Sequence, residues 1–223
     1  MQKFQSIKGF LFDLDGVITD TSIYHEMAWH QLADQLNIPW RAAFAEQLKG
    51  ISREASLAVI LDSTGKHVDY SEADKVAMAT AKNDNYLKLL QQLTPDSIAP
   101  GIEAFLVELK QAGYAIGLAS ASKNAPIVLE RLGLSDYFEA RVDPATLKNG
   151  KPAPEIFERC AALLGLQPTE CIGVEDAQSG IEAINAAGAI SVGIGSKEVL
   201  TKAKICFEQT QALTLANIRN AFH

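Results

Sequence analysis

The sequence contains few cysteines, and they are widely spaced. Three occur in 223 residues, at Cys160, Cys171 and Cys206, each among apolar neighbours. An odd number of isolated thiols is typical of a reduced intracellular protein and argues against a disulfide framework or a zinc site. We therefore expect a cytoplasmic protein.

Long apolar runs and net positive charge are also missing. No apolar stretch approaches the length of a membrane-spanning helix, and the N-terminus lacks the pattern of a secretion signal. Acidic residues outnumber basic ones by 27 to 20, which gives a formal net charge of -7. This balance predicts that the protein binds no nucleic acid and no membrane, although a local group of lysines and arginines could still hold a small anion.

The chain does contain a regular alternation of apolar strand and helix patterns from residue 101 onward. Helical patterns cover residues 102–112, 125–132, 154–164 and 179–187, and strand patterns cover 114–119, 138–142, 171–174 and 189–194. An apolar run at residues 7–12 supplies a further strand. This alternation predicts an α/β fold, a Rossmann-like parallel sheet with helices on both faces.

Residues 20–95 break this alternation. They carry helical patterns at residues 24–36, 54–61 and 71–93, with no convincing strand between them. We expect a core made of residues 1–19 and 96–223 and an inserted helical domain at 20–95. The insert follows the carboxyl end of the first strand, where open α/β sheets bind their ligands.

Two carboxylates follow the first strand directly. Asp13 and Asp15 are separated by one residue and followed by Gly16. On extended backbone both side chains point the same way, so their like charges repel unless a cation lies between them. The pair indicates a divalent metal site, or a nucleophile with an acid/base partner. The alternative is a loop in which one aspartate caps a helix and the other is merely exposed.

Three further polar groups are expected at the ends of other strands. Ser120 begins a loop with small hydroxyls and backbone amides, which favours an oxyanion, although Ser120 alone is more typical of a helix cap than of a ligand. Lys151 stands at a predicted helix start, where a cation does not help the helix. Glu175 and Asp176 follow the strand at 171–174, where acidic residues also suit a helix start.

Together these groups suit phosphoryl transfer. Asp13 would attack in line as nucleophile, while Lys151 and a metal neutralise the transferring oxygens. Asp15 would protonate the leaving oxygen and later deprotonate an attacking hydroxyl.

The same residues, in this order and spacing, resemble the motifs of the haloacid dehalogenase superfamily. The motifs are Phe12–Val17, Ser120, Lys151-Pro152 and Glu175-Asp176, and the resemblance covers essentially the whole chain. It implies that Asp13 forms an aspartyl-phosphate and that Asp15 is the acid/base. It also implies a Mg2+ ion held by Asp13, the backbone carbonyl of Asp15, Glu175 and Asp176. A phosphoryl group would be held by Ser120 and Lys151, and the helical insert would be a cap domain.

Longer segments resemble the sugar-phosphate mutases of that superfamily. They are Gly16–Thr21, Tyr24-His25, Trp29, Gln47–Glu54, Lys82–Tyr86 and Ala119–Asn124. The resemblance implies interconversion of β-glucose 1-phosphate and glucose 6-phosphate, with glucose 1,6-bisphosphate as the priming phosphoryl donor. The partner would be a small sugar phosphate, and we expect a monomer.

A mutase needs a second phosphate site, distal to Asp13. Arg53 offers a planar fork for this phosphate, where a lysine would give only a point charge. Further donors would come from Gly50, Ile51, Ser52, Ser122, Lys123 and Asn124. Lys49 and Lys82 would reach sugar hydroxyls or bridge the helical insert and the core. The alternatives are solvated lysines and a surface ion pair between Arg53 and Glu54, which would contribute little.

His25 follows Thr21 by one helical turn, close to the predicted start of the insert. A lone helical histidine is usually structural. Here it could instead hydrogen-bond Asp15 or the sugar and so link the insert to proton transfer, and Thr21 could control where Asp15 points.

Two other functions remain open from the sequence. A sugar-phosphate or phosphoglycolate-type phosphatase would share every core residue and differ in the insert and in using water as the acceptor. A non-enzymatic sugar-phosphate sensor would need the fold but not the complete set of Asp13, Asp15, Ser120, Lys151 and Asp176.

Overall fold

The computed structural model describes residues 4–222 and divides the chain into two compact units. The first, which we call the α/β unit, contains the chain up to Asp20 and from Thr94 onward. The second, the helical unit, is Thr21–Leu93.

The α/β unit is built on a six-stranded sheet in which every pairing is parallel. The strand order is β3-β2-β1-β4-β5-β6. The strands are β1 (Gly9–Phe12), β2 (Ala115–Leu118), β3 (Ala140–Arg141), β4 (Cys171–Glu175), β5 (Ile190–Ile194) and β6 (Ile205–Phe207). The predicted Rossmann-like parallel sheet is thereby confirmed. All residues of β1, β4 and β5 are buried, as expected for strands covered on both faces.

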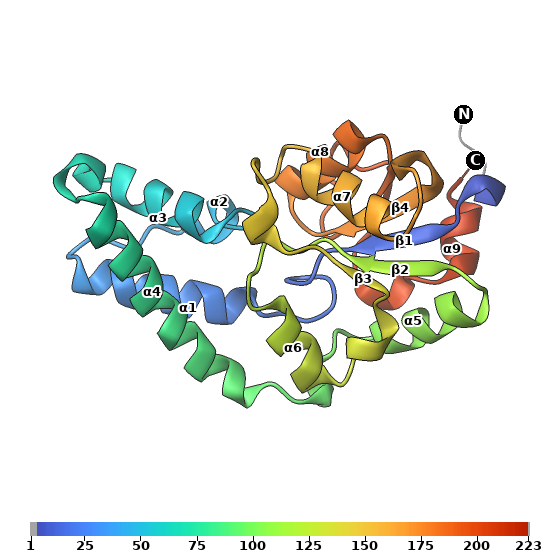
Figure 1. The fold of residues 1–223 in the computed structure, drawn as a ribbon, viewed down its shortest axis with the longest axis horizontal. Coiled ribbons are helices and arrows are strands. Elements are labelled where there is room, and N and C mark those ends of the chain that lie inside the picture. The colour runs from blue at the N-terminus through green and yellow to red at the C-terminus, as the bar shows by residue number, and fades with distance from the viewer. Residues whose placement is uncertain (1–3, 223) are drawn as a thin grey trace. The chain divides into compact units, whose positions relative to one another are not determined.

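Helices cover both faces of this sheet (Figure 1). α5 (Ile102–Gln111) and α6 (Ala125–Leu132) lie on one face, and α7 (Glu155–Leu163) and α8 (Gln178–Ala187) lie on the other. The short helix α9 (Leu215–Asn220) packs against α5. α6 and α8 each end at a glycine with left-handed backbone, Gly133 at φ 71° and Gly188 at φ 85°, which a residue with a Cβ would adopt only with strain.

The alternation of side chains along β1 determines which face Asp13 serves. Phe10 and Phe12 pack edge-on against Phe105 of α5, with ring centroids 5.6 and 6.0 Å apart. Leu11, which points the other way, packs with Phe157 and other residues of α7 and α8. Asp13 shares the parity of Leu11, so its carboxylate continues the α7/α8 face of the strand.

The helical unit contains α1 (Ser22–Gln35), α2 (Phe44–Gln47), α3 (Arg53–Asp62) and α4 (Glu72–Leu89). Its own buried cluster includes Trp29, Leu32, Leu57 and Ile60. The predicted helical run at 71–93 ends as α4 at Leu89 and continues as the 3-10 turn Leu90–Gln92. No helix among residues 4–222 has both the length and the apolar character needed to cross a bilayer.

Candidate active site

Three carboxylates meet at the carboxyl edge of the sheet. Asp13 directly follows β1, Glu175 is the last residue of β4, and Asp176 comes next. The Asp13 amide donates to the Val174 carbonyl at 3.0 Å, so the pairing of the two strands continues to this edge. One carboxylate oxygen from each of Asp13, Glu175 and Asp176 lies within 4.8 Å of the others. The sheet therefore holds residues that are far apart in sequence in one acidic group.

Lys151 lies between two of these carboxylates. Its Nζ donates to Asp13 Oδ1 at 2.6 Å and to Glu175 Oε1 at 3.1 Å, and its side chain is fully buried. Burial by itself would lower the pKa of Lys151, but the charges of Asp13 and Glu175 outweigh burial and raise it. The lysine is thus a permanent cation at this edge, and the ring of Phe157 lies 5.2 Å from its Nζ.

The burial and the neighbouring charges at this edge change the pKa of Glu175. Burial and the neighbouring charge of Asp13 raise its pKa well above the ordinary value, although Lys151 acts in the opposite direction. An oxygen-only donor set of three carboxylates fits a hard divalent cation such as Mg2+.

The loop after β2 supplies hydroxyls beside this edge. The Ala119 amide donates to the Phe12 carbonyl at 2.8 Å, which holds the start of the loop against the end of β1. Ser120 is buried, and its Oγ accepts from the Ser122 amide at 3.1 Å. Ser122 Oγ accepts in turn from the Asn124 amide at 3.3 Å. α6 begins only at Ala125, so Ser120 is not its cap.

Asp15 and Thr21 lie on the segment that leaves β1. Asp15 forms a bridge with Thr19, and the Gly16 amide donates to the Thr19 carbonyl at 2.9 Å. Thr21 is buried, and its carbonyl accepts from the amides of Tyr24 and His25 at the start of α1. Lys123 is exposed, whereas Asn124 is buried.

Two cationic side chains, Lys82 and Arg53, lie within the helical unit. We call these two residues, together with His25, Asn83 and Tyr86, the cationic cluster. The Nζ of Lys82 lies 2.7 Å from His25 Nδ1, and the Lys82 residue is only 2% exposed. His25 stacks on Tyr86 with ring centroids 3.9 Å apart, and Lys82 Nζ lies 4.8 Å from the same Tyr86 ring. The alternative of a solvated lysine therefore does not hold for Lys82.

This environment determines the protonation of His25. Burial, Lys82 and Arg53 all lower its pKa, well below the ordinary value of 6.5. An ammonium has only donors, so Nδ1 accepts from Lys82 and the hydrogen of the neutral ring is on Nε2. His25 thus contributes a dipole to the cluster and no charge at neutral pH.

Arg53 and its neighbours occupy the start of α3. Arg53 Nη2 donates to Asn83 Oδ1 at 2.7 Å, a contact between α3 and α4. Ser52 is the N-cap of α3, and its Oγ accepts from the Ala55 amide at 3.1 Å. Gly50 has left-handed backbone at φ 69°, and Ile51 is half-buried.

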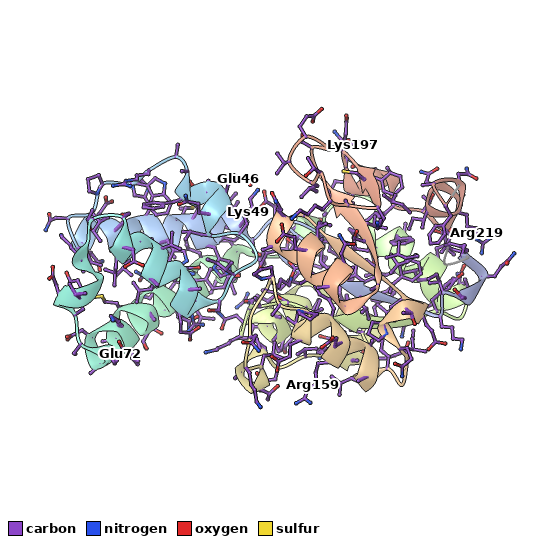
Figure 2. The ribbon with its side chains drawn as sticks, turned by 90° about the horizontal axis from the view of Figure 1, so that it is seen from above. Glu46, Lys49, Glu72, Arg159, Lys197 and Arg219 are labelled. Carbon is purple, nitrogen blue, oxygen red and sulfur yellow. The ribbon has the colours of Figure 1, made fainter. Side chains whose placement is uncertain are left out.

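Lys49 has a partner on the preceding helix. Its Nζ donates to Glu46 Oε1 at 3.0 Å, and the two side chains lie close together in Figure 2.

Four residues of these two groups had no specific role predicted from the sequence: Trp29, Asn83, Tyr86 and Phe157. The pairs His25 with Trp29 and Lys82 with Tyr86 are each four residues apart, which places both partners on one helix face. This four-residue spacing was the feature of the sequence from which the pairs could have been predicted. The contact between the two helix faces could not be predicted, because His25 and Lys82 are 57 residues apart.

Comparison with known proteins defines the class of this protein. Residues 7–188 match the family model of the haloacid dehalogenase-like hydrolases. The chain belongs to this family.

Particular relatives narrow the comparison. The chain is 46% identical to the β-phosphoglucomutase of Bacillus subtilis, over 94% of this chain and 92% of that one. The crystal structure of β-phosphoglucomutase from Clostridium difficile superimposes with a TM-score of 0.95 at 47% identity, covering 97% of both chains. A fructose-1-phosphate phosphatase of Escherichia coli is 31% identical, over 86% of this chain and 98% of its own.

Proposed function

We propose that this enzyme is a magnesium-dependent β-phosphoglucomutase. It interconverts β-glucose 1-phosphate and glucose 6-phosphate through enzyme-bound β-glucose 1,6-bisphosphate. The observation that carries the proposal is the presence of two cationic groups, the buried Lys151 in one unit and the buried Lys82 with the half-buried Arg53 in the other. A bisphosphate has two anionic ends, and each group suits one of them.

The core residues provide the phosphoryl transfer. Asp13 attacks phosphorus, an aspartyl-phosphate forms, and the bond from phosphorus to the leaving sugar oxygen breaks. Asp15 protonates that oxygen, and in the reverse half-reaction it removes the proton of the sugar hydroxyl that attacks the aspartyl-phosphate. Lys151 and the Ser120 hydroxyl hold the phosphoryl oxygens, with Lys151 kept in place by its bond to Glu175.

Asp13, Glu175 and Asp176 would hold Mg2+, together with Asp15. The oxygen donors of Asp13, Glu175 and Asp176 and the distances between them fit this ion. When bound, the ion would neutralise charge on the transferring phosphoryl oxygens.

The distal phosphate is assigned to the start of α3. Arg53 has its guanidinium oriented by Asn83, so less freedom is lost when it binds a phosphate. Ser52 Oγ already accepts from a backbone amide, which leaves its hydroxyl hydrogen for the ligand. Gly50, Ile51 and Lys82 would complete this side, Ser122, Lys123 and Asn124 would act from the α/β unit, and Lys49 would leave Glu46 to reach a sugar hydroxyl.

Thr21 and His25 are assigned to proton transfer. In this proposal Thr21 controls the direction of Asp15. His25 connects the cationic cluster to the proton transfer that Asp15 carries out.

A phosphatase is the second candidate, because relatives at about the 31% level include one. Both similar proteins at 46% and 47% identity are mutases, which favours the first candidate. Hydrolysis of a monophosphate also leaves a distal phosphate site without a purpose. The complete set of Asp13, Ser120 and Lys151 argues against a sensor without activity.

One reaction with two readouts tests the proposal. Enzyme, Mg2+ and β-glucose 1-phosphate, primed with a little glucose 1,6-bisphosphate, are assayed for glucose 6-phosphate and for free phosphate. The mutase predicts rapid formation of glucose 6-phosphate with little free phosphate. Release of phosphate without isomerisation would identify a phosphatase and overturn the proposal.

Arg53→Ala tests the distal site. It should weaken mutase turnover strongly while hydrolysis of a small phosphate ester is nearly unchanged. Arg41→Ala is the matched control, because Arg41 is an exposed arginine of the same unit that bonds only the Ser63 carbonyl among the contacts described. Equal losses of both activities in Arg53→Ala would contradict the distal role.

We also propose that the enzyme acts in the cytoplasm as a monomer on a small sugar phosphate, without nucleic acid or membrane partners. Sedimentation at assay concentration checks the monomer, and a dimer mass would overturn that part.

A further inference from the structure

The carboxylate of Glu175 lies where a side chain at position 180 would otherwise be. Gly180 is in the first turn of α8, directly beyond the end of β4. A Cβ placed on Gly180 would be 1.6 Å from Glu175 Oε1 and 2.1 Å from its Cδ. The three nearest atoms to that Cβ all belong to Glu175. The space beside α8 is therefore taken up by this one carboxylate.

Backbone conformation does not explain the glycine. Gly180 has an ordinary helical backbone and is absent from the residues with positive φ among those described. A glycine inside a helix destabilises it relative to alanine. The reason for glycine here must be space, and the group that uses the space is Glu175.

Glu175 has little freedom to move elsewhere. It is fully buried, its Oε1 accepts from Lys151 Nζ at 3.1 Å, and its Oε2 accepts from the Asp176 amide at 3.2 Å. The oxygen that a methyl group at 180 would displace is the same oxygen that holds Lys151. Displacing it would disturb both the lysine and the acidic group.

A similar arrangement exists for the neighbouring acid. A Cβ on Gly16 would lie 2.1 Å from Asp176 Oδ2. Gly16 also has positive φ, at 79°, so a substitution there would mix backbone strain with the steric effect. Gly180 is the clean test position.

We propose that Gly180 is a positioning residue for the acidic site. By leaving the first turn of α8 without a side chain, it seats the Glu175 carboxylate against Lys151 and within reach of Asp13 and Asp176. The role concerns the site itself and rests on the proposed function only in taking Mg2+ as the ion bound there.

The test uses three variants of the full chain: Gly180→Ala, Glu175→Ala and the double variant. Mg2+ affinity is measured by calorimetry without substrate, and the unfolding midpoint is measured with a chelator present. Gly180→Ala should weaken Mg2+ binding by about 10- to 100-fold, the usual effect of changing a residue that positions a metal ligand. With Glu175 already removed, adding Gly180→Ala should change Mg2+ affinity no further, and the midpoint should rise because alanine favours the helix.

Gly150→Ala is the matched control. Gly150 is also next to the site in sequence, but a Cβ there would meet nothing within 4 Å, and its φ is not positive. Its Mg2+ affinity should equal that of the unchanged protein.

The proposal is overturned if Gly180→Ala binds Mg2+ normally, or if it weakens binding equally in the presence and absence of Glu175. If Gly180→Ala alone does not fold, the midpoints of Glu175→Ala and the double variant decide. A double variant at least as stable as Glu175→Ala supports the proposal, and a less stable one contradicts it. Because no substrate is used, failure here is separate from failure of the mutase assay.

Discussion

The two units each bury a lysine, and they surround it differently. Lys151 of the α/β unit lies between the carboxylates of Asp13 and Glu175, at 2.6 and 3.1 Å. Lys82 of the helical unit lies against a nitrogen of His25 and over the rings of Trp29 and Tyr86, at 4.7 and 4.8 Å. One lysine partly neutralises an acidic site, and the other adds its charge to that of a nearby arginine.

This difference bears on how a protein of net negative charge would bind the sugar bisphosphate proposed above. The net charge of -7 gives no general attraction for phosphate. At the sheet edge, anion binding requires cations to offset three carboxylates, and a divalent ion is the natural complement. In the cationic cluster, burial lowers the pKa of His25 most, and the positive charges of Lys82 and Arg53 lower it further.

The largest effect is expected for Asp13→Asn, which removes one negative charge from beside Lys151. Turnover should fall by at least about 10³-fold because an amide is not a competent nucleophile. The fold should persist, since the amide oxygen can still accept from Lys151 and Glu175 remains in place. Steady-state kinetics and an unfolding curve check the two parts. Substantial mutase activity in this variant would remove Asp13 from its assigned role.

Replacing each lysine by methionine compares the two environments directly. Lys151→Met leaves the buried Asp13 and Glu175 carboxylates facing each other, and it should cost about 3–5 kcal/mol of unfolding free energy. Lys82→Met should cost only about 1 kcal/mol, because methionine packs well against aromatic rings and the hydrogen-bond partner of Lys82 described here is a neutral imidazole rather than a carboxylate.

Both variants are compared by denaturant unfolding in the presence of a chelator, so that Mg2+ does not stabilise the acidic site. Equal losses of unfolding free energy in the two variants would mean that the carboxylates around Lys151 do not make its charge more important for stability than that of Lys82.

The pH dependence of stability tests the helical unit alone. The pKa of His25 is lowered in the folded state, so near and below pH 6.5 the unfolded chain takes up a proton that the folded chain does not. Its neutral form therefore stabilises the fold fully above about pH 6.5, and this contribution is lost as pH falls, by up to about 1.4 kcal/mol per pH unit. His25→Asn keeps an acceptor for Lys82 and should lose less stability than the unchanged protein between pH 7 and pH 5.

His30→Asn is the control, because His30 is an exposed histidine of the same helix. Its stability is measured over the same pH range. A His25→Asn profile that matches it would show that the imidazole does not titrate as inferred.

The sequence predicted the sheet and the long helices because their patterns are long enough to be periodic. The predicted helix at 125–132 is α6, and the predicted strand at 171–174 is β4 less its last residue. β6, α2 and α9 were not predicted. They have three, four and six residues, too few to show a period of 2 or 3.6.

The same limit applies to the candidate site. Asp13 and Glu175 could be placed together because parallel strands end at one edge, so strand prediction alone brings them near each other. The pairing of Lys82 with His25 depends on how α1 packs against α4, and the space at Gly180 depends on how α8 lies on β4. Packing between helices is decided by whole surfaces and leaves no local mark in sequence.

The smallest effect concerns a feature that the two units share. Ser52 and Ser120 each accept a hydrogen bond from a backbone amide through Oγ. Each hydroxyl can therefore support the local backbone and also donate to a ligand. Ser52→Ala should cost about 1 kcal/mol of unfolding free energy through loss of the α3 cap, whereas Ser52→Gly should cost only a few tenths, because glycine is tolerated at this position. Both variants remove the hydroxyl, so both should weaken glucose 1,6-bisphosphate binding equally. Calorimetric affinities that follow stability, with Ser52→Gly binding like the unchanged protein, would show that Ser52 serves only as a cap.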